Sequence, residues 1–310
     1  MERTAEVQRL LTCRTYGHNL FLMIFCTRQR RFYYIGLVVL GSLNFFAAVR
    51  PSFGGEGPYF VTYNQNVEEP GSLEIGINAV QGKPRGDGNS FVGSWIEFEY
   101  GTRAWWTTEF YLDGQWTRNE STAFTGFRLE NRFRLFQGNH FINPLLYVEY
   151  ENLNAADKTL MEIVGFDSQN DSAVPNQIAR REHDHEIETR LILGSDFKSW
   201  NLSGNFVAEK NLSNYPWEFG YTVGISRSFV PTVPLGAGIE FYGGLGDWNR
   251  FTLRDTSQYL GPSLACKTAH GTKFRVSAAF GLTPQSHGLL LRLGVSHEIS
   301  HIDRRIRSLF

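Results

Sequence analysis

Apolar and polar residues alternate one by one along most of this chain. In the segment WIEFEY, Ile96, Phe98 and Tyr100 fall on one side of an extended backbone, while Glu97 and Glu99 fall on the other. The segments FRLENRFRL, LLYVEYEN and HEIETRLIL repeat this pattern. A period of two residues is the signature of a β-strand with two chemically different faces, so the alternation predicts an all-β protein.

Twelve such segments are expected, with residues rich in Gly, Asn, Asp and Pro between them. They span about 71–81, 90–101, 104–115, 121–136, 141–152, 184–196, 199–210, 215–228, 234–246, 257–268, 272–282 and 288–299. Most are longer than the strands of soluble sheets and long enough for a tilted strand to cross a bilayer. Alternate connections are short (GTRA, QGNH, FKS, VPTVP, AHGT), whereas 153–183 and 247–256 are long. These features predict one up-and-down antiparallel transmembrane β-barrel over residues 71–299.

The polar faces of these segments carry closely spaced charges of both signs. In a secreted soluble β protein they would face water, whereas in a membrane barrel they fill a polar lumen and the apolar faces meet lipid. Aromatic residues near the segment ends and glycines inside the strands favour the barrel, because interfacial girdles and curved sheets use them. The lumen-lining candidates are Glu97, Glu99, Glu109, Asp113, Arg128, Glu130, Arg132, Arg134, Glu149, Glu151, Glu186, Glu188, Arg190, Glu240, Arg275 and Arg292.

Composition excludes several other classes of protein. After about residue 50 no apolar run reaches the roughly 18 residues that a membrane helix needs. The chain has 30 Lys and Arg against 31 Asp and Glu with no basic block in its main part, so we expect no nucleic-acid partner. Of three cysteines, two lie in the N-terminal segment, which excludes a disulfide scaffold and leaves Cys266 as an expected packing residue.

The N-terminal segment has the pattern of a secretory signal. A basic cluster at 28–31 precedes an apolar run at about 33–46, and small residues follow at Ala47 and Ala48. We expect residues 1–48 to be a cleaved signal peptide with its true start at Met23; a retained membrane anchor is the alternative. Export through this signal predicts a location in the cell outer membrane of a Gram-negative bacterium.

Three further segments flank or interrupt the barrel. Residues 49–70 are rich in Gly, Pro and polar residues and are expected to form an irregular periplasmic lead-in. Residues 300–310 form a basic C-terminal tail that either extends the last strand or lies below the barrel. The long loop at 153–181 either folds inward as a constriction or is displayed outward as a receptor; its apolar stretch, Met161 to Val164, favours the constriction.

One cluster resembles a metal site. His183 and His185 lie on one strand face with carboxylates beside them. A charged rim where a long loop enters a strand has the same pattern, and no distant ligand is identified, so no metal or cofactor is expected.

An outer-membrane enzyme such as a phospholipase is a further possibility, with His287 or His297 beside Ser286 or Ser296. Such a triad is defined by geometry and not by spacing, so we predict no catalytic residues and no enzyme.

The signal peptide, the segment GSLEIGINAV, the hairpin WIEFEYGTRAWWTTEFYLDGQ and the twelve-segment layout together resemble bacterial outer-membrane barrels. Among these, the chain is most similar to the transporter-like proteins associated with phenol-degradation operons, in which an EYG strand end enters a short turn. The resemblance covers about residues 71–299. It implies a twelve-stranded Gram-negative barrel that transports an uncharacterised substrate, and it brings no catalytic residues.

These observations predict a channel or transporter for small solutes with a narrow charged lumen. The Arg and Glu rows either pair with one another across strands or line a selective path. Ten acidic candidates against six basic ones indicate a mild cation preference. The alternative is a non-conducting structural barrel or a loop-based binding or adhesin barrel. Outer-membrane lipid and the barrel-insertion machinery are the expected partners, with small solutes as cargo.

Overall fold

The computed structural model describes residues 57–307 except 87, 121, 160–162, 214, 230–234 and 269. The expected signal peptide, its start at Met23, residues 49–56 and the last three residues of the tail lie outside the described residues, as do Met161 and Glu162 of the long loop. Among the described residues, no helix is both long and apolar enough to cross a membrane.

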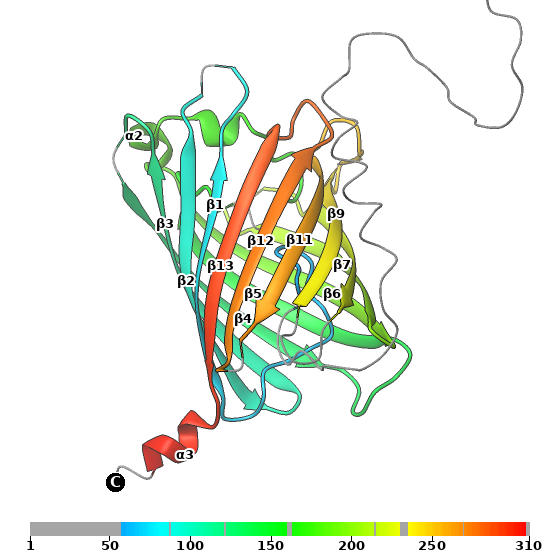
Figure 1. Cartoon of the computed structure of the whole chain (residues 1–310). Helices are drawn as coiled ribbons and strands as arrows, with labels where there is room; N and C mark the ends of the chain where they lie inside the picture. Colours follow the sequence, from blue (N-terminus) through cyan, green and yellow to red (C-terminus); the bar gives the residue numbers. More distant parts are fainter. Residues whose placement is uncertain are drawn as a thin grey trace, which may run out of the picture. The chain divides into compact units, whose positions relative to one another are not determined.

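Twelve long antiparallel strands close into a barrel in this part of the chain (Figure 1). Each strand pairs with its neighbours in sequence, and β1 pairs with β13 to close the ring. The strands are β1 (Leu73–Gly82), β2 (Phe91–Arg103), β3 (Trp106–Thr117), β4 (Ala123–Arg134), β5 (Asn143–Asn154), β6 (His183–Phe197), β7 (Trp200–Asn211), β8 (Glu218–Ser228), β9 (Leu235–Asp247), β11 (Gln258–Lys267), β12 (Thr272–Gly281) and β13 (Leu289–Ile299), with a two-residue strand β10 (Arg250–Phe251) beside β9. The predicted fold is confirmed, and the largest boundary error is at β8, expected at 215 and found at Glu218.

The two faces of the strands are divided as the alternation predicts. In β2, Ile96 and Phe98 are exposed, whereas Glu97 and Glu99 are buried inside the barrel. The other strands repeat this division, with exposed apolar side chains that include Ile77, Phe110, Leu129, Leu191, Phe206, Val223, Ile239, Leu264, Val276 and Leu293. An apolar exterior around a polar interior is the arrangement of a membrane-spanning barrel, because lipid solvates the outside.

Short and long connections lie at opposite ends of the barrel. The turn between β2 and β3 lies at the end where β1 begins and β13 stops. The loop from β5 to β6, which contains the 3-10 helix η1 (Asp171–Ala173) and the helix α2 (Asn176–Ala179), lies at the opposite end. Beyond β13 the tail forms the helix α3 (Ile302–Arg307) and does not extend the last strand (Figure 1).

The segment before β1 lies inside the barrel, which corrects the predicted periplasmic position. It has no helix or strand, yet Phe60, Val61 and Tyr63 are almost fully buried among lumen side chains. Figure 1 draws it as a blue trace that passes within the ring of strands before it enters β1. Composition does not separate the two positions. Gly, Pro and polar residues are equally suited to an irregular segment in solvent and to an irregular segment whose backbone is hydrogen-bonded by polar side chains of a lumen. We call residues 57–69 the plug.

Candidate functional site

The predicted lumen residues gather inside the barrel. Arg134 and Glu186 are half-buried. The other fourteen are buried: Glu97, Glu99, Glu109, Asp113, Arg128, Glu130, Arg132, Glu149, Glu151, Glu188, Arg190, Glu240, Arg275 and Arg292. The strand alternation places them there, because every second side chain of a barrel strand points inward.

Arginines in the lumen are surrounded by carboxylates from neighbouring strands. Arg132 on β4 lies 2.6 Å from Glu99 and 2.9 Å from Glu130, and it also contacts Glu109. Arg128 makes two hydrogen bonds with Asp113, at 3.0 and 3.2 Å. These buried pairs match the reading in which the charges satisfy one another, since an unpaired charge in this position would be costly.

Glu240 on β9 holds the plug by its backbone. Its Oε1 accepts a hydrogen bond from the N–H of Phe60, and its Oε2 accepts hydrogen bonds from the N–H groups of Val61 and Thr62, each at 2.8 Å. Hydrogen bonds from backbone N–H groups to a carboxylate are among the stronger ones in proteins. The plug therefore has a dedicated anchor in the barrel wall.

Tyr63 is the aromatic side chain that holds the middle of the plug. Its ring contacts the guanidinium groups of Arg132 and Arg190, whose central carbons are 5.2 and 4.9 Å from the ring centre. Its hydroxyl donates a hydrogen bond to Glu130 at 2.9 Å. Two cation–π contacts and a hydrogen bond from the hydroxyl therefore hold the ring in place.

The loop between β5 and β6 folds inward from the opposite end of the barrel. Lys158 is buried and donates hydrogen bonds to Thr117 and Asn176, at 3.3 and 3.0 Å. The loop backbone at Lys158 lies so close to Gly93 of β2 that a Cβ there would be 2.3 Å from a carbonyl oxygen. Of the two arrangements left open by the sequence, the described part of the loop adopts the constriction.

The plug and this loop meet inside the barrel. Val61 of the plug and Ile163 of the loop belong to one apolar cluster and line the same small void of about 10 Å³. Aromatic side chains of the barrel wall complete the cluster, among them Trp95, Tyr242 and Tyr259. The lumen is thus filled at its centre. Sequence reasoning missed this apolar layer because it assigned only charged residues to the interior.

An acidic cavity of about 260 Å³ lies beneath the loop. One Arg and one His face eight acidic side chains there, and burial raises the pKa of one of these, Asp167, well above its usual range. The acidic residues are Glu151, Asp157, Asp167, Asp171, Asp184, Glu186, Glu209 and Glu218. The Arg is Arg128, which Asp113 already engages, so it adds little positive potential to the cavity. Such a site attracts cations and repels anions. We call it the acidic cavity.

A second cavity, of about 350 Å³, lies at the end with the short turns. Gly57, Asn64 and Gln65 of the plug line it together with residues from the β4–β5 and β6–β7 turns. The plug therefore separates this cavity from the apolar centre of the barrel.

Ser172 and His287 form a close pair that does not have the polarity of a catalytic dyad. Ser172 Oγ donates to the carbonyl of Gln169 at 3.0 Å, so it can only accept at its 2.7 Å contact with His287 Nε2. Tyr259 accepts the backbone N–H of His287, and its hydroxyl lies 3.1 Å from Nδ1. Burial lowers the pKa of His287 to about 4, which keeps the ring neutral with its proton on Nε2. The pair therefore fastens the loop.

The predicted serines, Ser286 and Ser296, and the histidine His297 make other contacts. On β13, Ser296 points inward and is buried, whereas the adjacent His297 is exposed and contacts Thr272. Ser286 is buried and exchanges hydrogen bonds with the backbone of Gln258.

The predicted metal-like cluster is divided by the strand. His183 and His185 are exposed on the outer face of β6, where their rings stack on each other. Asp184 and Glu186 instead line the acidic cavity inside the barrel. The histidines and carboxylates therefore cannot share one ion.

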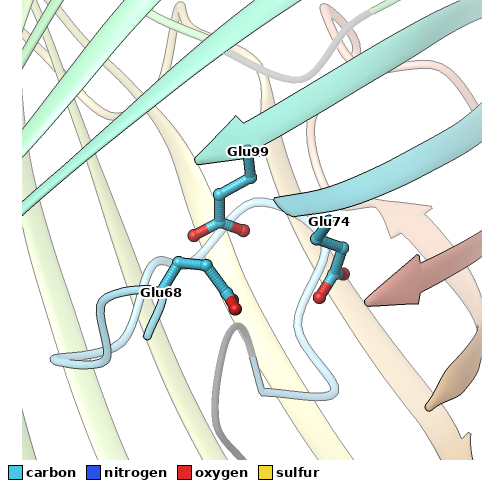
Figure 2. A group of neighbouring side chains, drawn as sticks. All are labelled: Glu68, Glu74 and Glu99. Carbon is cyan, nitrogen blue, oxygen red and sulfur yellow. The ribbon is translucent and has the colours of Figure 1, made fainter. Parts of the chain in front are cut away.

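In the described part of the chain, two groups of three buried carboxylates have oxygen atoms within 4.8 Å of one another. The first comprises Glu68, Glu74 and Glu99, which point toward one another from the plug, β1 and β2 (Figure 2). The ammonium group of Lys273 contacts Glu74, so a cation already occupies this group. The second comprises Glu151, Glu188 and Glu209, two of which line the acidic cavity.

Comparisons with known proteins place the fold but not a family. No protein-family model and no curated protein match the sequence. The structure is similar to that of an outer membrane channel from Pseudomonas putida F1, with a TM-score of 0.50, 10% identity, and coverage of 75% of this chain and 97% of that chain. The KdgM and NanC porins align with TM-scores of 0.42 and 0.44, at 10% and 8% identity, over 72% and 73% of this chain and 98% and 100% of theirs. The first likeness shows a shared barrel fold. The narrower resemblance to proteins of phenol-degradation operons stays a prediction.

Proposed function

We propose that this chain is an outer-membrane channel for small cationic solutes, held closed by its own plug in the conformation described. The observation that carries the proposal is the acidic cavity, in which eight acidic side chains face one arginine that is already paired. Cavities of one sign concentrate ions of the opposite sign and exclude the others, particularly where protein walls keep water out. The likeness in fold to a bacterial outer membrane channel supports the same class of function.

The arrangement of connections supports an orientation in the membrane. Outer-membrane barrels place short turns on the periplasmic side and longer loops outside. In this orientation the acidic cavity receives solutes from the outside, and the plug enters from the periplasm. The cleaved signal peptide that the sequence predicts would deliver the chain to this membrane. Recovery of the protein in the outer-membrane fraction, with heat-modifiable migration on a gel, tests the location; recovery as a soluble periplasmic protein contradicts it.

Planar-bilayer recording of the purified protein tests the channel. The proposal expects low conductance from the full chain and a larger conductance after residues 57–69 are replaced by a Gly and Ser linker of equal length. In a KCl gradient the reversal potential of the open variant should have the sign of K⁺ selectivity. An open variant that conducts anions preferentially would refute the cation assignment, and one that never conducts would refute the channel.

The non-conducting alternative has its own support. Lumen arginines such as Arg128 and Arg132 are paired with carboxylates, and three consecutive backbone N–H groups anchor the plug, which together resemble a filled structural interior. A barrel of this kind would remain silent in bilayers even after the plug is replaced. The same recording therefore separates the two functions.

A further inference from the structure

Glu68 is a buried acid at the point where the plug joins the barrel wall. Its backbone N–H donates a hydrogen bond to Thr107 Oγ1 at 2.8 Å, which fixes the residue against β3. Its side chain points toward Glu74 and Glu99, and only 2% of the residue is exposed (Figure 2). A carboxyl oxygen of Glu68 lies within 4.8 Å of carboxyl oxygens of Glu74 and Glu99, and the positive charge of Lys273 attracts it as well.

The positive charges around Glu68 are engaged by other carboxylates. Lys273 of β12 contacts Glu74. Arg132 of β4 lies 2.6 Å from Glu99. On β13, Glu298 faces the same region, and Lys267 of β11 lies 2.9 Å from it. An ionised Glu68 would therefore add a negative charge to a buried group of acids whose cations are already in use.

A protonated Glu68 removes this conflict, because a neutral carboxyl costs less to bury and can donate its O–H to a neighbouring carboxylate. We propose that Glu68 is a proton-operated latch: the plug stays docked while this carboxyl holds a proton and is released when the proton is lost. The inference rests on the proposed role of the plug as the closing element of the channel.

The direction of the pH dependence follows from the two states of the plug. Burial, together with the nearby charge of Glu99, raises the pKa of docked Glu68 to about 8 from its ordinary value of 4.5. Docking therefore takes up a proton between these two values. The docked state is favoured fully below pH 4.5, weakens as the pH rises, and loses this contribution above pH 8.

Thiol labelling measures docking without reference to conductance. Thr62 is buried in the plug, so a cysteine there reacts only when the plug is released. The measurement uses the full chain with its three native cysteines changed to serine, and the labelling rate is divided by that of a cysteine at exposed Ser213 to correct for thiol ionisation. The normalised rate should rise about tenfold per pH unit between pH 5.5 and 7.5, as release of one proton requires.

Two substitutions give this measurement a matched pair. Glu68→Gln imitates the protonated acid, so labelling should stay slow and independent of pH. Glu69→Gln changes the exposed neighbour and should leave the pH dependence intact. A labelling rate that still depends on pH in the Glu68→Gln variant overturns the latch. Protection of the Thr62 cysteine that EDTA abolishes also overturns it, because such protection would indicate a bound metal. If labelling depends on pH but the open variant does not conduct, the latch is retained and only the proposed channel function is refuted.

Discussion

Glu240 Oε2 lies 2.8 Å from the backbone nitrogen of Val61, so a charged side chain of β9 is bound to the main chain of a segment 179 positions away. The same carboxylate accepts the N–H groups of Phe60 and Thr62. Because the contact uses the backbone of the plug, it constrains the path of the segment more than the identity of its side chains.

Glu240→Gln should loosen the plug. The substitution removes the negative charge and turns an N–H₂ group toward backbone donors, so at least one of the three hydrogen bonds is lost. Hydrogen bonds to a charged group contribute about 1.5 to 3 kcal/mol each, and loss of one predicts at least a roughly tenfold larger released fraction. Labelling of a cysteine at Thr62 measures this fraction. A labelling rate equal to that of the parent would show that Glu240 does not hold the plug.

Substitutions at Tyr63 separate the contribution of its hydroxyl to docking of the plug from the contribution of its ring. Tyr63→Phe removes the hydrogen bond to Glu130 but keeps the contacts of the ring with Arg132 and Arg190. We expect a loss of docking free energy of about 1 kcal/mol for Phe and a larger loss for Leu, which also removes both cation–π contacts. The same labelling assay ranks the variants. Equal effects of Phe and Leu would show that the arginines do not stabilise the ring.

A disulfide between the plug and the wall should lock the channel shut. A Cβ built on Gly194 of β6 would lie 2.8 Å from both the Cβ and the backbone nitrogen of Gln65, so the two segments must move apart to reach the Cβ separation of a disulfide, about 3.5 to 4.5 Å. Gln65→Cys with Gly194→Cys, in a background that also carries Glu240→Gln, should not conduct when oxidised and should conduct after reduction. Gly194→Cys alone is the control. Conductance that is insensitive to reduction would mean that the plug does not close the lumen.

Charges in the acidic cavity should set the selectivity of the open channel. Asp184→Asn with Glu186→Gln removes two carboxylates from the cavity wall and should reduce K⁺ preference in a KCl gradient. Asp255→Asn is the control, compared per charge removed, because Asp255 forms an exposed pair with Arg250 outside the cavity. An equal shift of the reversal potential per charge removed in both variants would show that overall charge, and not the cavity, determines selectivity.

The sequence is sufficient for the barrel but not for what fills it. The alternation Ile96, Glu97, Phe98, Glu99 is local, so it identifies a strand and both of its faces without knowledge of any partner. The plug depends on contacts such as Tyr63 with Glu130, which no local pattern encodes. The apolar run of Tyr59, Phe60 and Val61 was the available signal, because such residues are rarely left in solvent next to a lumen.

The candidate site was incomplete for the same reason. Glu74, Glu209 and Lys273 have the inward phase of their strands and could have been added to the lumen set by extending the alternation. Lys158 and Glu68 could not, since they lie in irregular segments and their burial depends on how those segments fold into the barrel. The acidic cavity likewise depends on loop residues that pattern reasoning leaves unplaced.

The fastening of the loop to His287 should fail in acid. Burial lowers the pKa of His287 to about 4 from its ordinary value of 6.5, so the fastened state binds the ring in its neutral form. This contribution is complete above pH 6.5 and is lost as the pH falls toward 4. Hydrogen exchange of the backbone N–H of Gln169, which bonds to the carbonyl of Gln285 beside the pair, should therefore accelerate below pH 6.5 after correction for intrinsic rates. His287→Gln cannot take up a proton in this range, so this variant should not show the faster exchange in acid. If the variant exchanges with the same pH profile as the parent, the faster exchange is caused by the carboxylates of the acidic cavity and not by His287.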